Sequence, residues 1–206
     1  MAGGGDGAAQ LSGTRHSSRV VLARHGKPDW DSTTWIPGRD LGEWSRGRDA
    51  APIDPAHQPS GQLRRIAASA HGLIASPLRR SLESAHLLSP KAIPLVDSVF
   101  REVELPTDIR SGLPLPPQVW VKLARTGWYA GWSPGAESYE DAKRRAALAA
   151  ETLAELVPDH GCLLVVGHGI FNGLIGAELR GEGWEGPRFR PRRLWAFGVY
   201  TLASGS

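Results

Sequence analysis

The stretch VVLARHGKPDW, residues 20–30, places a short apolar run directly before an arginine, a histidine and a glycine. An apolar run without polar alternation is typical of a strand that is covered on both faces. Two further runs have this character, and a fourth segment near the C-terminus also favours a strand. The four expected strands are 20–23, 72–75, 162–166 and 195–202.

Helical patterns lie between these apolar runs, and the clearest covers residues 138–157, where alanine and leucine recur at helical spacing. Its outer face could pair Glu140 with Arg144 and Asp141 with Arg145, one turn apart. Helices are also expected over 61–72 and 77–88. Strands that alternate with helices predict an α/β fold with three α/β/α layers and a mostly parallel central sheet.

Two long segments interrupt this alternation, residues 31–58 and 104–136, both rich in proline and tryptophan. Loops of this length inside a compact domain usually act as lids or as walls of a pocket, so we expect long loop insertions over a site. The tryptophans of these segments could form an aromatic pocket, but the packing of two loops against each other is favoured slightly. These tryptophans are Trp35, Trp44, Trp120, Trp128 and Trp132.

The length of 206 residues fits one domain. Residues 1–18 contain no apolar segment of the secretory type, so we expect a disordered leader, a single catalytic domain over 19–206 and a cytoplasmic location. No run approaches the roughly 18 apolar residues of a membrane span, and no membrane partner is expected. Cys162 is the sole cysteine and is expected to be a buried structural thiol.

Arginine supplies most of the positive charge, with 20 Arg against 4 Lys and a net charge of +3. Arginine suits the planar, bidentate binding of phosphate, although a general preference for arginine explains most of this usage. The net charge is too small to indicate a nucleic-acid partner. The segment RFRPRR, residues 188–193, is expected to be a solvated basic turn.

Three strand ends carry the residues that indicate a site: Arg24 and His25, Arg80, and His168. The carboxyl ends of parallel strands meet at one edge of a sheet, where ligands of open α/β folds bind. If these strands are parallel neighbours, the four side chains converge on one spot.

The segment between the second strand and its helix would suit an anion. Ser76 is a good helix N-cap and Pro77 a favoured first helical residue, so free N–H groups and the positive end of the helix dipole would face the ligand. Guanidinium groups that each bind two oxygens would complete a phosphate-binding site.

The two histidines can then take separate parts in phosphoryl transfer. A neutral imidazole can attack phosphorus, and nearby arginines would keep it unprotonated. The second histidine can stabilise charge on the transferring group. A proton donor is still needed, and the segment FREVELP, residues 100–106, offers Glu102 and Glu104.

The order of RHG, SPLRRSLESA, FRE and GHG along the chain resembles the histidine phosphatase superfamily, which has the phosphoglycerate mutase-like fold, over residues 19–202. The resemblance implies that His25 is the nucleophile and that Arg24 and Arg80, rather than Arg79, bind phosphate. It also implies that His168 both binds phosphate and takes part in catalysis.

The resemblance further implies that Glu102 is the general acid and base, with Glu104 as the less favoured choice, and that no metal or other cofactor is needed. The segment GAESYEDA, residues 135–142, resembles a family segment that opens a long helix. Glu137 and Ser138 could therefore line or cap the site, and Gly169 of the late motif is a further candidate.

The sequence departs from the phosphoglycerate mutases of this family at three positions, where Pro28, Asp31 and Ile170 replace polar residues. An anionic Asp31 beside a phosphate would repel it unless a cation intervened. Trp30 does match, whereas Lys27 and Asp29 are expected to shape the entrance. The lost polar contacts favour a hydrolase over a mutase.

The sequence thus predicts a metal-independent phosphatase that acts through a phosphohistidine on His25 and releases inorganic phosphate. Its substrate would be a small phosphomonoester or, alternatively, a phosphorylated protein. Mutase-type phosphoryl transfer is one alternative. A non-catalytic phosphate-binding protein of the same fold is another, disfavoured because every catalytic element is present. A nucleic-acid binder would rest on arginine content alone.

Overall fold

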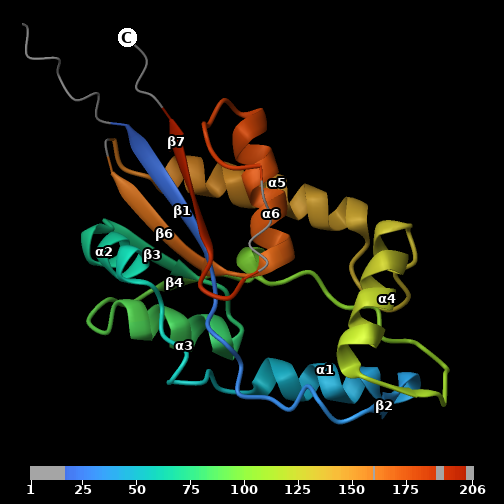
Figure 1. Cartoon of the computed structure of the whole chain (residues 1–206). Coiled ribbons are helices and arrows are strands. Elements are labelled where there is room, and N and C mark those ends of the chain that lie inside the picture. Colours follow the sequence, from blue (N-terminus) through green and yellow to red (C-terminus); the bar gives the residue numbers. More distant parts are fainter. Residues whose placement is uncertain (1–16, 160, 189–192, 203–206) are drawn as a thin grey trace, which may run out of the picture.

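A five-stranded sheet forms the centre of the protein (Figure 1), as seen in a computed structural model that describes residues 17–159, 161–188 and 193–202. The strand order is β4-β3-β6-β1-β7. Only the edge strand β7 runs antiparallel, which confirms the expected mostly parallel sheet. The strands are β1 (Ser18–Arg24), β3 (Gly72–Ala75), β4 (Leu95–Val96), β6 (Cys162–Gly167) and β7 (Phe197–Leu202).

Successive residues of β1 point to opposite faces of the sheet, and each face builds its own core. Val20 and Leu22 join one cluster, Val21 and Ala23 the other. Helices α5 and α6 cover the first face and α2 and α3 the second (Figure 1), so the expected three layers are confirmed. These helices are α2 (Gly61–Ser69), α3 (Arg79–Leu88), α5 (Tyr139–Leu156) and α6 (Gly169–Gly181).

Helix α5 begins where the sequence predicts, because the Ser138 hydroxyl accepts a hydrogen bond from the Asp141 N–H at 3.1 Å. The predicted ion pairs on its outer face were wrong in register. Glu140 pairs with Lys143 at 2.8 Å and Asp141 pairs with Arg144, both three residues apart rather than four. Arg145 is not available to Asp141 because it binds Glu137.

Helix α3 begins at Arg79, two residues later than predicted, and its N-cap position is Leu78. The prediction of Ser76 as N-cap and Pro77 as first helical residue was therefore wrong. Leu78 has extended backbone angles, and the Ser76 hydroxyl lies 2.7 Å from the His168 ring instead. Helix α2 also stops early, at Ser69, because the chain must extend before β3 begins.

The two segments described as long loops contain regular structure, so that description was wrong. They form helices α1 (Leu41–Ala50) and α4 (Pro117–Tyr129), joined by the short strands β2 (Ile36–Pro37) and β5 (Pro114–Leu115). Short 3₁₀ turns lie at η1 (Gly38–Asp40) and η2 (Ser98–Phe100). We call β2, η1, α1, β5 and α4 the α1–α4 lobe; it lies beside the three-layer body (Figure 1).

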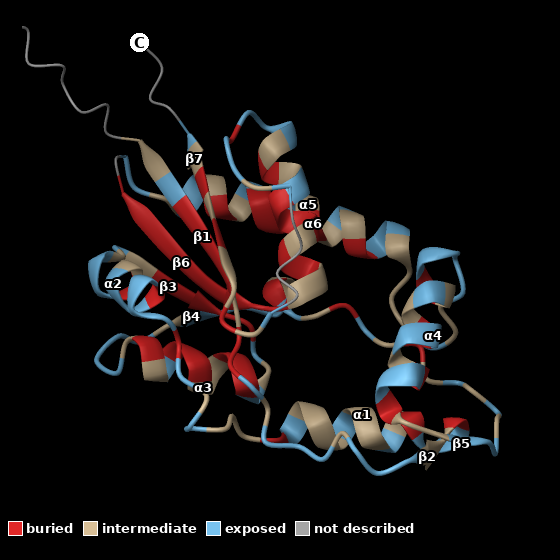
Figure 2. Ribbon diagram, viewed as in Figure 1, coloured by how far each residue is buried: buried red, intermediate tan, exposed pale blue. Residues whose placement is uncertain are grey.

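Trp120 holds the two parts of this lobe together, in agreement with the packing role favoured for it, whereas Trp35 is largely exposed. It is buried with Leu41 of α1 and Ala124 of α4, and its indole N–H donates to the Ile36 carbonyl at 2.9 Å. Trp128 belongs to the main core instead. Much of the rest of the lobe is exposed, in contrast to the buried sheet (Figure 2).

Other expectations can be compared with the described residues. The predicted leader lies outside them except for Ser17 and Ser18, and Ser18 already opens β1 opposite Leu202. The basic segment 188–193 lies outside them at 189–192. Cys162 is buried, as expected. None of the helices described is long and apolar enough to cross a membrane.

The alanine-rich face of α5 packs directly on the core, so the helix offers a matched pair of leucines for a stability test. Leu153 is fully buried, whereas Leu148 is 55% exposed. Leu153→Ala should lower the free energy of unfolding by about 2–5 kcal/mol, because it removes core contacts and leaves a cavity. Leu148→Ala should change it by about 0.5 kcal/mol or less. Urea unfolding of both variants checks this, and equal effects would contradict the packing described.

Candidate active site

His25 follows the last residue of β1 and its ring has a defined proton arrangement. The ring is 1% exposed, and Nδ1 lies 2.7 Å from the Gly26 carbonyl. A carbonyl can only accept, so Nδ1 carries the proton and donates. In the neutral ring Nε2 is then unprotonated, and it accepts a hydrogen bond from Nε of Arg80 at 3.2 Å. The lone pair of Nε2 therefore faces the Arg80 guanidinium.

The turn after His25 is held tightly by its neighbours. The Gly26 N–H donates to the Ser84 hydroxyl at 2.8 Å. A Cβ at position 26 would lie 2.5 Å from the ring of Trp195, so glycine is required there by close approach. Trp195 itself has a positive φ of 60°, an uncommon backbone state for a bulky residue. The ring of Trp195 and the backbone of the turn at Gly26 thus fix each other's positions.

His168 ends the neighbouring strand and is the N-cap position of α6. It is fully buried; its Nε2 lies 2.7 Å from the Ser76 hydroxyl and 3.3 Å from that of Ser81. Asn172 accepts from the His168 N–H and donates to the Ala23 carbonyl at 3.0 Å, which ties the ends of β6 and β1 together. The rings of His25 and His168 are consequently 5.2 Å apart.

The structure distinguishes clearly between the two arginines that begin α3. Arg80 is 2% exposed and lies between His25 and Asp49, whose carboxylate is 2.6 Å from its Nη1. Arg79 is half-exposed and pairs with Glu83 at 2.7 Å. Of the two, only Arg80 is in contact with a histidine of the site.

Burial and positive charge act on both histidines in the same direction. Burial, followed by the charge of Arg80, lowers the pKa of His25 and of His168 well below the ordinary histidine value. Burial also lowers the pKa of Arg24, an effect that the negative charge of Glu102 opposes. Two neutral imidazoles among charged guanidinium groups therefore define the electrostatics of the site.

The two carboxylates of the segment 100–106 have different surroundings. Oε1 of Glu102 accepts from the backbone N–H groups of Val103 and Phe171, both at 3.1 Å. Phe171 lies in the first turn of α6, so Glu102 reaches the helix that His168 caps. Glu104 is exposed and accepts from the Glu137 N–H at 3.2 Å. Of the two carboxylates, only Glu102 is hydrogen-bonded to the helix that begins directly after His168.

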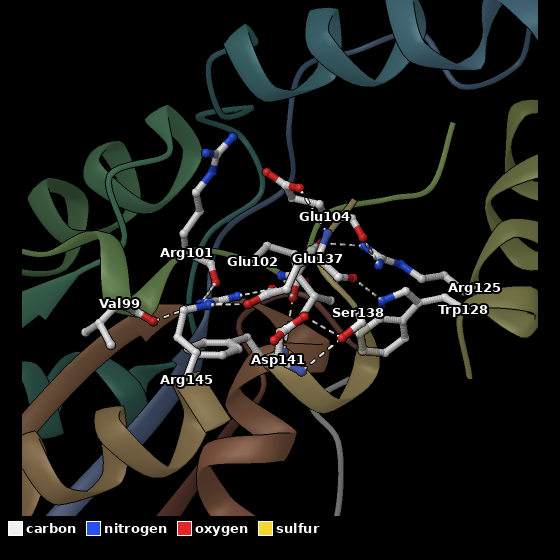
Figure 3. A network of polar contacts seen from close by, with 12 residues as sticks. Val99, Arg101, Glu102, Glu104, Arg125, Trp128, Glu137, Ser138, Asp141 and Arg145 are labelled. Carbon is white, nitrogen blue, oxygen red and sulfur yellow. Dashed lines mark hydrogen bonds and ion pairs between the residues drawn. The ribbon is translucent and has the colours of Figure 1, made fainter. Parts of the chain in front are cut away.

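Glu137 is engaged by Arg145, which organises the network in Figure 3. The guanidinium binds both oxygens of Glu137, at 2.8 and 2.6 Å, and donates to the carbonyls of Val99 and Arg101. It also lies 3.8 Å from the ring centre of Phe171. This network fixes the chain on both sides of Glu102, whereas the Glu137 carboxylate itself is directed to Arg145.

A cavity of about 350 Å³ lies between the three-layer body and the α1–α4 lobe. Arg80 and Glu102 form part of its wall, and Arg80 also contacts the buried ring of His25. Charged residues make up much of the remaining wall: Arg46, Arg48, Asp49, Arg101, Glu104 and Arg125. In the part of the chain described, no three His, Cys, Asp or Glu side chains are grouped as metal ligands.

Several residues of this site were not anticipated. Arg48, Asp49 and Arg125 lie on helices that the sequence patterns did not reveal, and no local signal marks them. Ser81 and Asn172 lie on expected helical or late-motif segments, and their buried contacts with His168 depend on neighbours distant in sequence. The candidate Gly169 opens α6 directly after His168.

The residues that depart from the mutase pattern lie outside the cavity wall. The Asp31 carboxylate accepts from the N–H and hydroxyl of Thr33, both at 2.7 Å, and hydrogen bonds from Thr34 and Thr33 lower its pKa. Because Asp31 is not part of the cavity wall, the expected repulsion of a phosphate bound there is not supported. Ile170 packs on the main core, and Pro28 bridges to Ile53.

The chain belongs to the histidine phosphatase superfamily (branch 1), whose sequence profile matches residues 20–194. No curated protein sequence matches the chain significantly. A mycobacterial glucosyl-3-phosphoglycerate phosphatase is similar in structure, with a TM-score of 0.53 and 24% identity over 78% of each chain.

A phosphoserine phosphatase mutant from Entamoeba histolytica, solved with phosphoserine, has a TM-score of 0.56 and 13% identity over 91% of this chain and 95% of that one. At these levels of identity both likenesses show the shared fold.

The lowered pKa values of His25 and His168 make stability depend on pH. As pH falls, the unfolded chain takes up protons before the folded one, so the stabilisation is present above the unfolded pKa of about 6.5 and lost below it. As pH falls from 6 to 5, each histidine should lower the free energy of unfolding by about 1 kcal/mol. His168→Gln should remove the contribution of His168 to this pH dependence, as measured by urea unfolding at several pH values. An unchanged slope would show that His168 is not buried in its neutral form.

Proposed function

We propose that the protein is a metal-independent phosphatase that hydrolyses a small phosphomonoester in the cytoplasm through a phosphohistidine on His25. The observation that carries this proposal is the hydrogen bond from Nδ1 to the Gly26 carbonyl, which leaves Nε2 as the available nucleophile. Structural neighbours include phosphatases solved with vanadate and with phosphoserine, which is consistent with such a substrate.

Substrate binding would rearrange the contact between Arg80 and His25. The Nε–H of Arg80 now donates to Nε2, the atom that must attack phosphorus. A phosphoryl oxygen is a stronger acceptor because it is charged, so it would take over this N–H and free the lone pair. Arg24 would supply a second guanidinium, and a neutral His168 would take up charge as the transition state forms.

The reaction would then run in two steps. In the first, Nε2 of His25 forms a bond to phosphorus while the bond to the leaving oxygen breaks and Glu102 gives that oxygen a proton. In the second, Glu102 accepts a proton from water, the water oxygen bonds to phosphorus, and the P–N bond breaks. The products are an alcohol and inorganic phosphate.

The surroundings of the carboxylates support Glu102 over Glu104 as the proton donor. Glu102 is bonded to the first turn of α6, and its charge acts on Arg24. Glu104 is exposed and its carboxylate is bonded to the backbone of Glu137. A general acid must reach the leaving oxygen from beside the phosphoryl group, which the position of Glu102 allows.

Steady-state hydrolysis of p-nitrophenyl phosphate from pH 5 to 8, with EDTA present, tests the proposal. Wild type should turn over, and His25→Ala should lose activity by at least about 10³-fold, because the variant lacks the nucleophile. Acid-labile label from a ³²P-substrate should appear on wild type and not on the variant. Activity that EDTA abolishes, or that survives in His25→Ala, would sink the proposal.

The two carboxylates provide a matched comparison. Glu102→Gln should lower kcat by about 10²–10⁴-fold on a substrate with a poor leaving group, such as a phenyl or alkyl phosphate, because proton donation is lost. The loss should be smaller on p-nitrophenyl phosphate. Glu104→Gln should retain activity within a few-fold. The reverse pattern would assign the acid to Glu104.

A further inference from the structure

Helix α1 brings an additional arginine to the cavity. Arg48 lines the cavity together with Arg80 and Glu102, although it comes from the α1–α4 lobe rather than from a strand end. We propose that Arg48 is a third phosphoryl-binding arginine of this protein and contacts the transferred group directly. This inference rests on the proposed phosphatase function and adds a residue to it.

The neighbouring residue fixes the position of α1 relative to the site. Asp49 binds Nη1 of Arg80 at 2.6 Å, and Nε of the same guanidinium contacts His25 at 3.2 Å. The last turn of α1 is therefore connected to the nucleophile through the Arg80 guanidinium alone. Arg48 precedes Asp49 directly and lies on the cavity wall, so its side chain is available to a ligand bound against Arg80.

The guanidinium of Arg48 differs in its bonding from two others around the cavity. Arg80 binds Asp49, and Arg125 donates to the carbonyls of Val103 and Glu104. Arg48 donates no hydrogen bond to any residue that the structure describes. Burial and the charges of neighbouring residues act on its pKa. Its N–H donors are thus left for a ligand. The exposed Arg46 and Arg101 of the wall likewise donate no side-chain hydrogen bond to a described residue, but Arg48 is half-buried.

The charges near Arg48 indicate an anionic ligand. Burial, followed by the charge of Arg80, lowers the pKa of Arg48 to about 10, so it still carries its proton at neutral pH. Three close guanidiniums, of Arg24, Arg48 and Arg80, face the carboxylates of Asp49 and Glu102. If Glu102 is protonated as the general acid, the remaining charge is about +2, which a phosphoryl dianion would neutralise.

A role for Arg48 also agrees with the way in which the segment after His25 departs from the mutase pattern. Asp31 occupies a position at which related mutases have a polar amide, and its carboxylate is bound by Thr33 rather than directed to the cavity. A cation from α1 would supply a contact that the loop after His25 does not. Arg48 is thereby a binding residue from a part of the chain that the four sequence motifs do not include.

Binding of inorganic phosphate, measured by calorimetry, tests the proposal beside kcat/KM for p-nitrophenyl phosphate. Arg48→Ala should weaken phosphate binding and lower kcat/KM by about 10- to 100-fold, the effect of losing one or two charged hydrogen bonds. The phosphate affinity and kcat/KM of Arg48→Lys should lie between those of wild type and Arg48→Ala, since lysine keeps the charge and loses the planar fork. The control Arg39→Ala removes an exposed charge of the same lobe and should stay within about 2-fold.

The outcomes separate this proposal from the one on which it rests. A wild-type protein that neither binds phosphate nor hydrolyses the substrate overturns the phosphatase function itself. A wild type that does both, with Arg48→Ala equal to it, overturns only the role of Arg48. Lower thermal stability with unchanged phosphate affinity would assign Arg48 a purely structural role and likewise overturn the proposal. A loss of phosphate affinity in both Arg48 variants, at unchanged stability, supports it.

Discussion

The parallel pairing of β1 with β6 is the constraint on which the site depends. Its register sets Arg24 opposite Gly167, so the residues that follow, His25 and His168, leave the sheet side by side. Asn172 then bonds to both strand ends and limits how far they can separate. A shift of this register by one residue would also turn each buried side chain to the other face, so the same apolar pattern that builds two cores fixes the histidines.

The second theme of the structure is the burial of positive charge beside neutral imidazoles. Guanidinium groups keep their protons when buried, whereas histidines do not, so burial sorts the two residue types into cations and potential nucleophiles. Asp49 and Glu102 offset part of this charge. Such a site is electrostatically incomplete on its own and favours a dianionic ligand.

The α1–α4 lobe contributes to the site from outside the three layers. Trp120 ties α1 to α4, and Asp49 ties α1 to Arg80. The lobe therefore carries both the ion-pair partner of Arg80 and much of the cavity wall. This arrangement connects the segments that differ most from the shared motifs to the place where a substrate would be held.

The sequence by itself determined the α/β layers and the strand ends, and its motifs indicated His25, Arg80 and His168 as candidate site residues, because apolar periodicity and local motifs depend on neighbours in the chain. The tertiary structure alone decided the pairing of Ser76 with His168, the role of Asp49 and the position of Arg48. Helix α1 escaped prediction because its helical pattern is weak and contains two glycines. Helix α4 is as amphipathic as the predicted helices, but it lies in a segment whose proline and tryptophan content favoured a loop. The stability of α1 and α4 comes from contacts such as that of Trp120 with Leu41, which join segments far apart in sequence.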